Sequence, residues 1–359
     1  MKVLLLTTDA YGGHGGIALY NRDVAEALAE IPDVSEVTVV VRNMPFSPEA
    51  RDKKIKFLSG SAGSKYKFVF RSVIESFKSY DFIICGHINL LPLVAALNIK
   101  MRLPVVLMVY GIDVWKLPYK MAEKWISVVD QVWCISDVTR VRMNAWANLP
   151  DEKYVILPNA IHLDRYGIRE RRLDLIERYN LASSRIIMTL GRLPEAERYK
   201  GVDEVLEVFQ SLLEAEPSLK YLVAGDGNDR ARLERKAKAL GIADKVVFAG
   251  MIREAEKADL FQLADAFVMP GRGEGFGFVF LEAMACGVPA VGSTLDGSRE
   301  ALRGGELGEL VNPEELGSVR RGILRALEKK KSIPAGLNYF SWPAFSMRID
   351  VAVKKLMEH

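Results

Sequence analysis

The chain has 359 residues, of which 49% are hydrophobic and 26% charged, and its formal net charge is +3. This length favours two domains of about 150–200 residues, and the composition is that of an ordinary globular protein. The small net charge gives no indication of a nucleic-acid partner, and no apolar run in the sequence approaches the ~18 residues of a membrane span.

The amino terminus and the cysteines provide two further indications. Residues 1–9 turn polar too soon for a signal peptide, so a cytoplasmic location is expected. Cys85, Cys134 and Cys286 are odd in number and widely spaced, each in or beside an apolar segment. They are predicted to be small core residues, and neither a metal site nor a disulfide framework is indicated.

Short β-branched runs alternate with helical patterns along the whole chain, which predicts parallel sheets covered on both faces. The first half has predicted strands at 3–7, 37–41, 82–85, 105–109, 131–135 and 154–157, with helices at 17–29 and 90–100. A polar connection at 158–164 follows. The second half has predicted strands at 186–190, 219–224, 245–248, 266–269 and 289–291, with helices at 202–214, 230–240, 255–263 and 278–286. An amphipathic helix at 342–357 ends the chain.

Each half carries a loop suited to phosphate. Gly12 to Gly16 follow the first strand and open the first helix, although the pattern is a weak dinucleotide fingerprint without an acidic residue after the second strand. In the second half, Gly191-Arg192 ends a strand and Lys200-Gly201 follows. An arginine and a lysine converging there suit a diphosphate; the alternative is a solvated, charge-rich loop.

Two carboxylates, Glu274 and Glu282, flank a glycine-rich turn that leads from a strand into an apolar helix. In an open α/β sheet ligands bind at this position, and the helix amino terminus favours phosphate. Glu274 in the turn is predicted to bind a polyol, and Glu282 is predicted to reach a ribose. The alternative is that Glu282 only complements the helix dipole and Glu274 is solvated.

In this order and spacing the motifs resemble those of retaining nucleotide-sugar glycosyltransferases with the GT-B fold, specifically glycosyltransferase family 4, or group 1. The resemblance covers nearly the whole chain. The segments that carry it are 12–16, 19–28, 157–161, 191–192, 200–201, 223–227, 246–250, 274–282 and 285–289.

The resemblance implies two doubly wound Rossmann-like domains facing across a cleft. Residues 1–160 would bind the acceptor, residues 161–340 would bind the donor, and residues 341–359 would form a helix that crosses back to the first domain. The implied reaction is hexosyl transfer from a UDP- or GDP-linked sugar to a glycan, lipid-linked or small-molecule acceptor. It would proceed with retention, by front-face attack, with no cofactor and no metal.

The resemblance also implies roles for individual residues. Arg192 and Lys200 would neutralise the diphosphate, Glu274 would contact the sugar, and Glu282 would bind the ribose. The remaining donor-site residues would be Gly191, the backbone of Gly275, Phe276, Gly277 and Phe278, the base-contacting Met251 and Ile252, and Gly15 and Gly16 approaching the diphosphate from the first domain.

One position departs from the family pattern. Tyr110 stands where a histidine near the reacting sugar is usual. A tyrosine can still donate a hydrogen bond to a sugar hydroxyl, but it carries protons less readily at neutral pH. Asp113 is expected either to hold the sugar or acceptor, or to cap a helix before Val114. Ala160 and His162 replace the usual glycine and aspartate of the linker.

The acceptor side is less defined. His14 in the glycine loop and His87 after a strand are candidate acceptor contacts; the alternatives are an incidental surface residue for His14, and for His87 a packing role with Asn89 as the helix cap. Loops at 44–67 carry a basic, aromatic-rich run that extends to Arg71. This surface either docks on anionic lipid headgroups, as a peripheral contact at the inner membrane face, or is a solvated charged face.

Three other classes fit parts of the pattern. A sugar-nucleotide epimerase would share the fold and donor without needing an acceptor. A nucleotide-sugar-binding protein without activity is favoured by Tyr110. A phosphorylase is disfavoured because no lysine-anchored coenzyme segment stands out.

Overall fold

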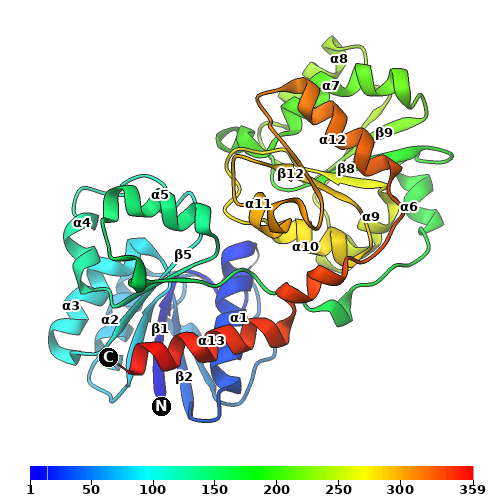
Figure 1. Cartoon of the computed structure of the whole chain (residues 1–359). Coiled ribbons are helices and arrows are strands. Elements are labelled where there is room, and N and C mark those ends of the chain that lie inside the picture. The colour runs from blue at the N-terminus through cyan, green and yellow to red at the C-terminus, as the bar shows by residue number, and fades with distance from the viewer. Residues whose placement is uncertain (14, 359) are drawn as a thin grey trace. The chain divides into compact units, whose positions relative to one another are not determined.

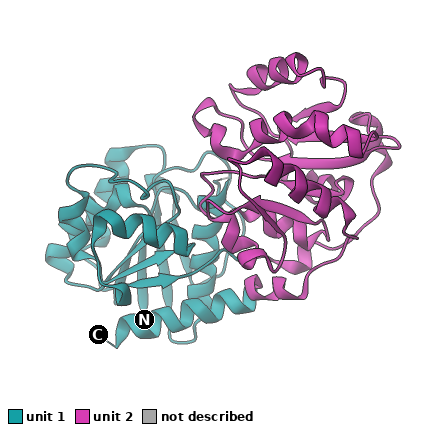
Figure 2. Ribbon diagram, turned by 45° about the horizontal axis from the view of Figure 1, so that its top comes forward, with its two compact units in different colours: residues 1–160, 342–359 teal, residues 161–341 magenta. Residues whose placement is uncertain are grey.

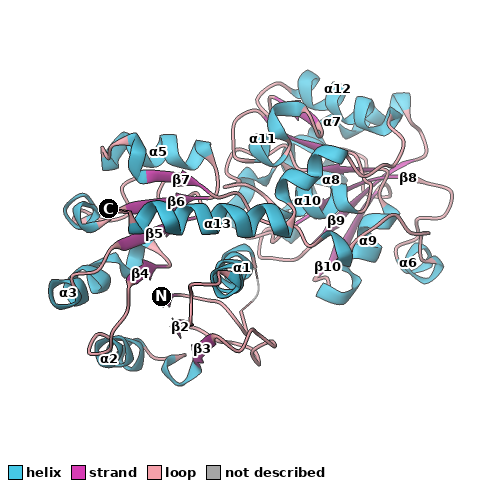
Figure 3. Cartoon of the chain, turned by 60° about the horizontal axis from the view of Figure 1, so that its bottom comes forward, coloured by secondary structure: helices cyan, strands magenta, loops and turns pink. Residues whose placement is uncertain are grey.

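The computed structural model describes residues 1–13 and 15–358. The chain divides into two compact units, Met1–Ala160 with Trp342–His359, and Ile161–Ser341 (Figure 2). Each unit holds a parallel sheet with helices on both faces (Figure 3). The predicted fold class, two doubly wound α/β units, is therefore confirmed.

The first unit is built on a sheet with strand order β3-β2-β1-β4-β5-β6-β7; Figure 1 labels β1, β2 and β5 of this sheet. The chain runs outward from β1 to β3 and then returns to pair β4 with the other side of β1. The order therefore reverses between β1 and β4. The strands are β1 (Lys2–Thr7), β2 (Glu36–Val41), β3 (Ile55–Leu58), β4 (Phe82–Cys85), β5 (Val105–Val109), β6 (Gln131–Cys134) and β7 (Tyr154–Ile156).

Alternate residues of these strands point to opposite faces, and both faces are buried. Leu6 and Cys85 pack into one core with Phe68 of α2 and Val94 of α3. The carboxy-terminal helix α13 packs against α1, where Trp342 Nε1 donates to Glu30 Oε1 at 2.8 Å. The helices are α1 (Gly16–Glu30), α2 (Lys65–Glu75), α3 (Leu91–Met101), α4 (Ala122–Trp125), α5 (Asp137–Ala147) and α13 (Trp342–Met357).

The second unit repeats the plan with strand order β10-β9-β8-β11-β12-β13, again parallel. The reversal falls between β8 and β11. The strands are β8 (Arg185–Leu190), β9 (Leu219–Ala224), β10 (Val246–Gly250), β11 (Ala266–Val268), β12 (Ala290–Ser293) and β13 (Glu309–Val311). The helices are α6 (Leu173–Arg178), α7 (Val202–Ala215), α8 (Arg230–Ala239), α9 (Lys257–Leu263), α10 (Phe278–Ala285), α11 (Ser298–Ala301) and α12 (Leu316–Glu328).

Several features differ from the sequence-based expectations, among them helices α2, α5, α6 and α12, which were not predicted. Strands β3 and β13 were not predicted, because each is short and mixes polar with apolar residues. The basic run at 44–67, predicted to lie in loops, contains β3 and the first turn of α2. The predicted polar connection at 158–164 begins with buried residues, since Ala160 and Ile161 are both enclosed.

Two further observations concern the apolar residues. Cys85, Cys134 and Cys286 are buried thiols, as the sequence predicts. In the part of the chain that the structure describes, no helix combines the length and the apolar character that crossing a bilayer requires.

Candidate active site

In the second unit, the predicted donor residues gather where the strand order reverses. The loops after β8, β9 and β10 interlock there: Gly191 N donates to Ala224 O at 3.0 Å, and Gly225 N donates to Gly250 O at 2.8 Å. A Cβ on Gly225, which has φ +127°, would lie 1.8 Å from Gly191 O. Only glycine fits this contact. The carboxyl edge of the sheet is therefore a closely packed platform, at the place where ligands bind in open α/β sheets.

The structure brings the two predicted cations together above this platform. Lys200 extends over Gly191, where a Cβ would lie 3.5 Å from Lys200 Nζ. Lys200 is 16% exposed and Arg192 is 79% exposed, and both contact one carboxylate, that of Glu197, at 2.8 and 2.6 Å. This one carboxylate offsets only part of the two positive charges, and an anionic ligand would compete with Glu197 for both cations.

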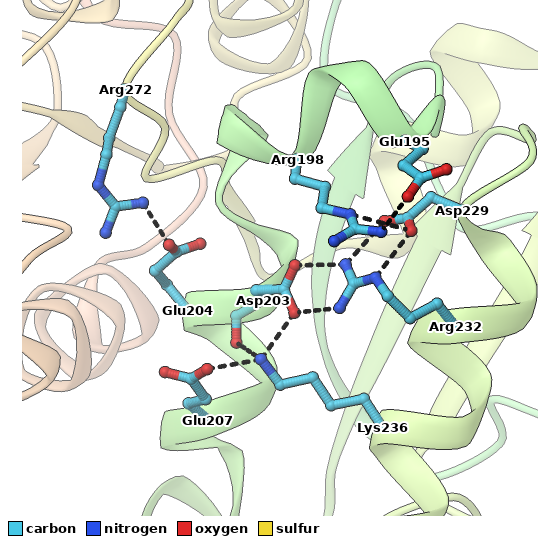
Figure 4. A network of polar contacts seen from close by, with 9 residues as sticks. All are labelled: Glu195, Arg198, Asp203, Glu204, Glu207, Asp229, Arg232, Lys236 and Arg272. Atoms are coloured by element: carbon cyan, nitrogen blue, oxygen red, sulfur yellow. Dashed lines mark hydrogen bonds and ion pairs between the residues drawn. The ribbon is translucent and has the colours of Figure 1, made fainter.

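The other charged side chains of this loop join a separate network of ion pairs (Figure 4). Arg198 pairs with Glu195 at 2.8 Å and with Asp229 at 3.3 Å. Asp229 also accepts from Arg232, whose hydrogen bonds hold the pKa of Asp229 below its ordinary value. Arg232 binds Asp203 with both terminal nitrogens, at 2.8 and 2.6 Å. This network joins α7, α8 and the loop, and so fixes the backbone that carries Lys200.

Glu274 lies in a loop that the chain holds from two sides. Its N–H donates to Asp296 Oδ2 at 3.0 Å, and its carbonyl accepts from Gly297 N at 2.8 Å. Burial raises the pKa of Glu274 to about 7, against the attraction of Lys200, and the carboxylates of Asp296 and Glu197 raise it further. The side chain is half-buried, so the alternative of a freely solvated carboxylate is wrong.

Asp296 was missed by the sequence reading. It is fully buried, and besides Glu274 its carboxylate accepts from Ser298 N at 3.0 Å and from Ser298 Oγ at 2.6 Å. The signal was present in the sequence, because Asp296-Gly297 lies in the loop that follows the buried strand β12 at the carboxyl edge. Asp296 positions Glu274 through its backbone.

The turn from Gly275 to Phe278 leads directly into α10. Gly277 is the residue before the helix and has φ +94°. The first helical residues, Phe278 to Phe280, include no acidic side chain, and a glycine offers no capping oxygen. The helix amino terminus therefore presents N–H groups suited to an anion. The ring of Phe276 is buried and packs edge-on against Phe340 at 5.5 Å, so only its backbone can face a ligand.

Glu282 is 3% exposed and already has partners. Lys257 Nζ lies 2.5 Å from Glu282 Oε1, and the hydroxyl of Tyr166 donates to the same oxygen at 3.0 Å. Burial raises the pKa of Glu282, and Lys257 opposes that rise. The sequence reading foresaw neither partner. Among the predicted base contacts after β10, Met251 is 85% exposed and Ile252 is half-buried.

In the first unit the glycine loop follows β1, at the reversal of that sheet. Gly12 and Gly13 are buried, and a Cβ on Gly12 would lie 2.4 Å from Phe46 O, so they serve packing. Gly15 and Gly16 are exposed at the start of α1, and the space beside Gly15 is open. The predicted contact residue His14 lies outside the described residues.

Tyr110 follows β5 and is bound within its own unit. Its hydroxyl lies 2.6 Å from Asn21 Oδ1 and 2.8 Å from Gly86 O, and burial raises its pKa. Asp113 accepts from Tyr110 N at 3.1 Å, and burial raises the pKa of Asp113 to about 7. No helix follows at Val114 in the described structure, so the helix-cap interpretation is wrong; Asp113 closes a turn instead.

His87 lies beside Tyr110, with ring centroids 6.3 Å apart. Its Nδ1 accepts from Asn89 N at 3.1 Å, so the cap is His87 and the interpretation that assigned it to Asn89 is wrong. Burial lowers the pKa of His87, which favours a neutral ring at pH 7. Tyr110 and His87 thus stand together at the carboxyl edge of the first sheet, and both have structural contacts.

We expect the variant Tyr110→Phe to lose about 1–2 kcal/mol of unfolding free energy, because Asn21 Oδ1 and Gly86 O lose the one hydroxyl proton that they share. Urea unfolding measures the loss. Tyr119→Phe, which removes one hydroxyl bond to Ile88 O, is the matched control and should lose less. A fall in turnover without a loss of stability would instead assign the Tyr110 hydroxyl to the substrate.

Comparisons with known proteins agree with this arrangement. Residues 14–165 match the family Glycosyltransferase Family 4, and residues 175–334 match Glycosyl transferases group 1. A GDP-mannose-dependent alpha-(1-6)-phosphatidylinositol monomannoside mannosyltransferase of Mycolicibacterium smegmatis is 32% identical over 202 residues, which are 54% of this chain and 52% of that protein. The match therefore spans about half the length of that relative. An uncharacterized glycosyltransferase of Methanocaldococcus jannaschii is 26% identical over 341 residues, 87% of this chain and 85% of that protein.

Solved structures share the whole fold. HepE of Anabaena, in complex with UDP and glucose, superposes with a TM-score of 0.74 at 19% identity, over 99% of both chains. Sucrose-phosphate synthase of Thermosynechococcus elongatus gives 0.75 at 20% identity, also over 99% of both chains. With one family match on each half of the chain and the GT-B fold over nearly all of it, this protein belongs to the family 4, or group 1, glycosyltransferases.

Proposed function

We propose that this glycosyltransferase moves a hexose from a nucleoside diphosphate sugar to an acceptor hydroxyl, with retention of configuration and without a metal. The observation that carries the proposal is the convergence of Lys200 and Arg192 on one carboxylate, on the platform at the strand-order reversal. Glu274 lies near enough to Lys200 for that charge to act on its pKa. Two cations beside a half-buried carboxylate suit a sugar bound to a diphosphate.

In this proposal each donor residue has a distinct task. The diphosphate displaces Glu197 from Arg192 and Lys200, and the two cations then balance the charge that develops on the leaving group. The N–H groups at the start of α10 bind the phosphate next to the sugar. Glu274 accepts hydrogen bonds from the sugar hydroxyls. Glu282 keeps Lys257 and Tyr166 on Oε1 and offers Oε2 to the ribose.

The acceptor hydroxyl attacks the sugar carbon from the same face from which the diphosphate leaves. The departing phosphate takes the proton of the acceptor hydroxyl. No second carboxylate is then needed as a nucleophile, in contrast to retaining glycosidases. HepE binds UDP and glucose, whereas the mycobacterial relative is named for GDP-mannose, so the base remains open between UDP and GDP. The acceptor is a glycan, a lipid-linked sugar or a small molecule.

The test is nucleoside diphosphate release from UDP-, GDP- and ADP-sugars, with and without mixed glycan and lipid acceptors, beside the variant Glu274→Ala. Acceptor-dependent release that survives EDTA and is lost in the variant supports the proposal. Conversion of the donor sugar without an acceptor would identify an epimerase. Tight donor binding with no release would identify a binding protein without activity.

We also expect Glu197→Gln to bind the nucleoside diphosphate about three- to tenfold more tightly, because the variant no longer neutralises Arg192 and Lys200. Calorimetric titration measures the affinity. Glu195→Gln is the matched control, since Glu195 pairs only with Arg198 among the cations of this loop in the described structure, and it should leave the affinity unchanged. Weaker binding in Glu197→Gln would show that Glu197 orients the cations.

A further inference from the structure

Helix α2 carries its apolar residues on the side that faces solvent. Tyr66, Phe70 and Phe77 are 86%, 68% and 72% exposed, and Val73 and Ile74 lie between them in the same orientation. Their spacing of four, three, one and three residues places the first four on one face of α2 (Lys65–Glu75), and Phe77 extends that face just past the end of the helix. These five residues are called the α2 face below.

The opposite side of the helix explains why the α2 face cannot turn inward. Phe68 and Ser72 are buried against the sheet, and Glu75 is fully enclosed. Glu75 accepts from the hydroxyl of Tyr80 at 2.7 Å and pairs with Arg71 and Lys78 at 2.9 and 2.7 Å. Rotation of α2 would break these contacts and bury unpaired charge. The outward apolar face is therefore built into the fold.

The surroundings of the α2 face are strongly basic. Residues 51–78 contain eight lysines and arginines but only two acidic residues, whereas the whole chain carries a net charge of only +3. Lys65 and Lys67 lie in the first turn of α2, where the helix dipole disfavours cations and no acidic residue compensates. Lys100 of α3 places its ammonium 2.9 Å from the ring centroid of Phe77.

We propose that the α2 face docks on the surface of an anionic lipid bilayer. Aromatic and aliphatic side chains would enter the boundary between headgroups and acyl chains, and the lysines around them would meet the phosphates. An anionic bilayer offers the α2 face both apolar burial and charge attraction. A neutral surface would offer no charge attraction, and a purely charged partner would offer no apolar burial. The inference goes beyond donor chemistry, because it uses no residue of the donor site.

The experiment is co-sedimentation of the full chain with vesicles of phosphatidylcholine alone and vesicles that also contain phosphatidylglycerol. The wild type should partition at least about tenfold more strongly onto the anionic vesicles, and added salt should weaken the binding. The double variant Phe70→Glu with Phe77→Glu, and separately Lys65→Glu with Lys67→Glu, should each reduce binding about tenfold or more.

The matched control is Met347→Glu with Val351→Glu, because these α13 residues are 67% and 60% exposed and apolar. This control should bind like the wild type, and circular dichroism verifies that all variants are folded. The proposal is overturned if the wild type does not bind anionic vesicles, or if the α2 and α13 variants lose binding equally. It is also overturned if gel filtration shows a self-associated wild type that Phe70→Glu with Phe77→Glu dissociates, since the α2 face would then join copies of this chain.

Discussion

Glu274→Ala should lower kcat by about 10²- to 10³-fold. The half-buried carboxylate acts close to Lys200, where few water molecules can replace its hydrogen bonds to the sugar. Donor affinity should change much less, because the diphosphate contacts stay in place. Steady-state rates and calorimetric binding of the donor separate the two effects.

The control Glu274→Gln keeps the shape and removes the charge. Burial raises the pKa of Glu274 to about 7, so the carboxyl is protonated below that pH and ionised above it. The wild-type kcat/KM should therefore rise with pH up to about 7 and then level off, and this rise should be missing in Glu274→Gln. Equal pH profiles for the two proteins would contradict an ionised Glu274.

The same shift has a consequence for stability. The folded-state pKa of Glu274 lies above its unfolded value of 4.5, so ionisation costs the folded protein stability as the pH rises from about 4.5 to 7. Glu274→Gln should accordingly be more stable relative to the wild type at pH 8 than at pH 4.

Rescue of Glu274→Ala by azide would indicate a covalent intermediate in place of front-face attack.

Lys200→Met should reduce kcat/KM by about 10²- to 10³-fold, mainly because the leaving diphosphate loses its more enclosed cation. Arg192→Met should cost less, since Arg192 is far more exposed and its charge is better screened. In Lys200→Met the donor KM should rise, and product inhibition by the nucleoside diphosphate should weaken.

A cation of the same loop supplies the comparison for Lys200. Arg198 pairs with Glu195 and Asp229 and does not share Glu197 with Lys200, so Arg198→Met should leave kcat/KM within about threefold of the wild type. If Arg198→Met and Lys200→Met lost activity equally, the loss would reflect disturbance of the loop, and Lys200 would have no special role at the diphosphate.

The sequence predicted the central strands and the edge strands β7 and β10, but it missed the edge strands β3 and β13. Strands β1, β4 and β5 are buried on both faces and therefore read as continuous apolar runs. Strand β3 alternates polar and apolar residues at a sheet edge, so its pattern resembled a basic loop. Helix α2 was missed for a related reason: its large apolar residues face outward, which a search for a buried stripe does not detect.

For the site, the sequence predicted the chemical groups but not their partners. Lys200 and Glu274 were identified from local motifs, because a strand end followed by glycine and a charge is visible within a few residues. The contacts of Glu282 with Tyr166, and of Tyr110 with Asn21, join residues 116 and 89 positions apart, and only the folded chain brings them together. Such contacts distinguish a side chain that is available to a ligand from one that already has hydrogen-bond partners within the protein.

The place of α13 in the first unit makes that unit discontinuous along the chain. Its aromatic Phe345 packs edge-on against Tyr20 at 5.9 Å, and the hydroxyl of Tyr20 donates to Leu157 O at 2.9 Å. During synthesis the first unit therefore cannot complete its fold until the ribosome has translated the entire second unit and then α13. The second unit begins and ends at adjacent points, since Ile161 N donates to Phe340 O at 2.7 Å. It has the anatomy of an inserted domain, and residues 161–341 form a natural fragment for separate expression.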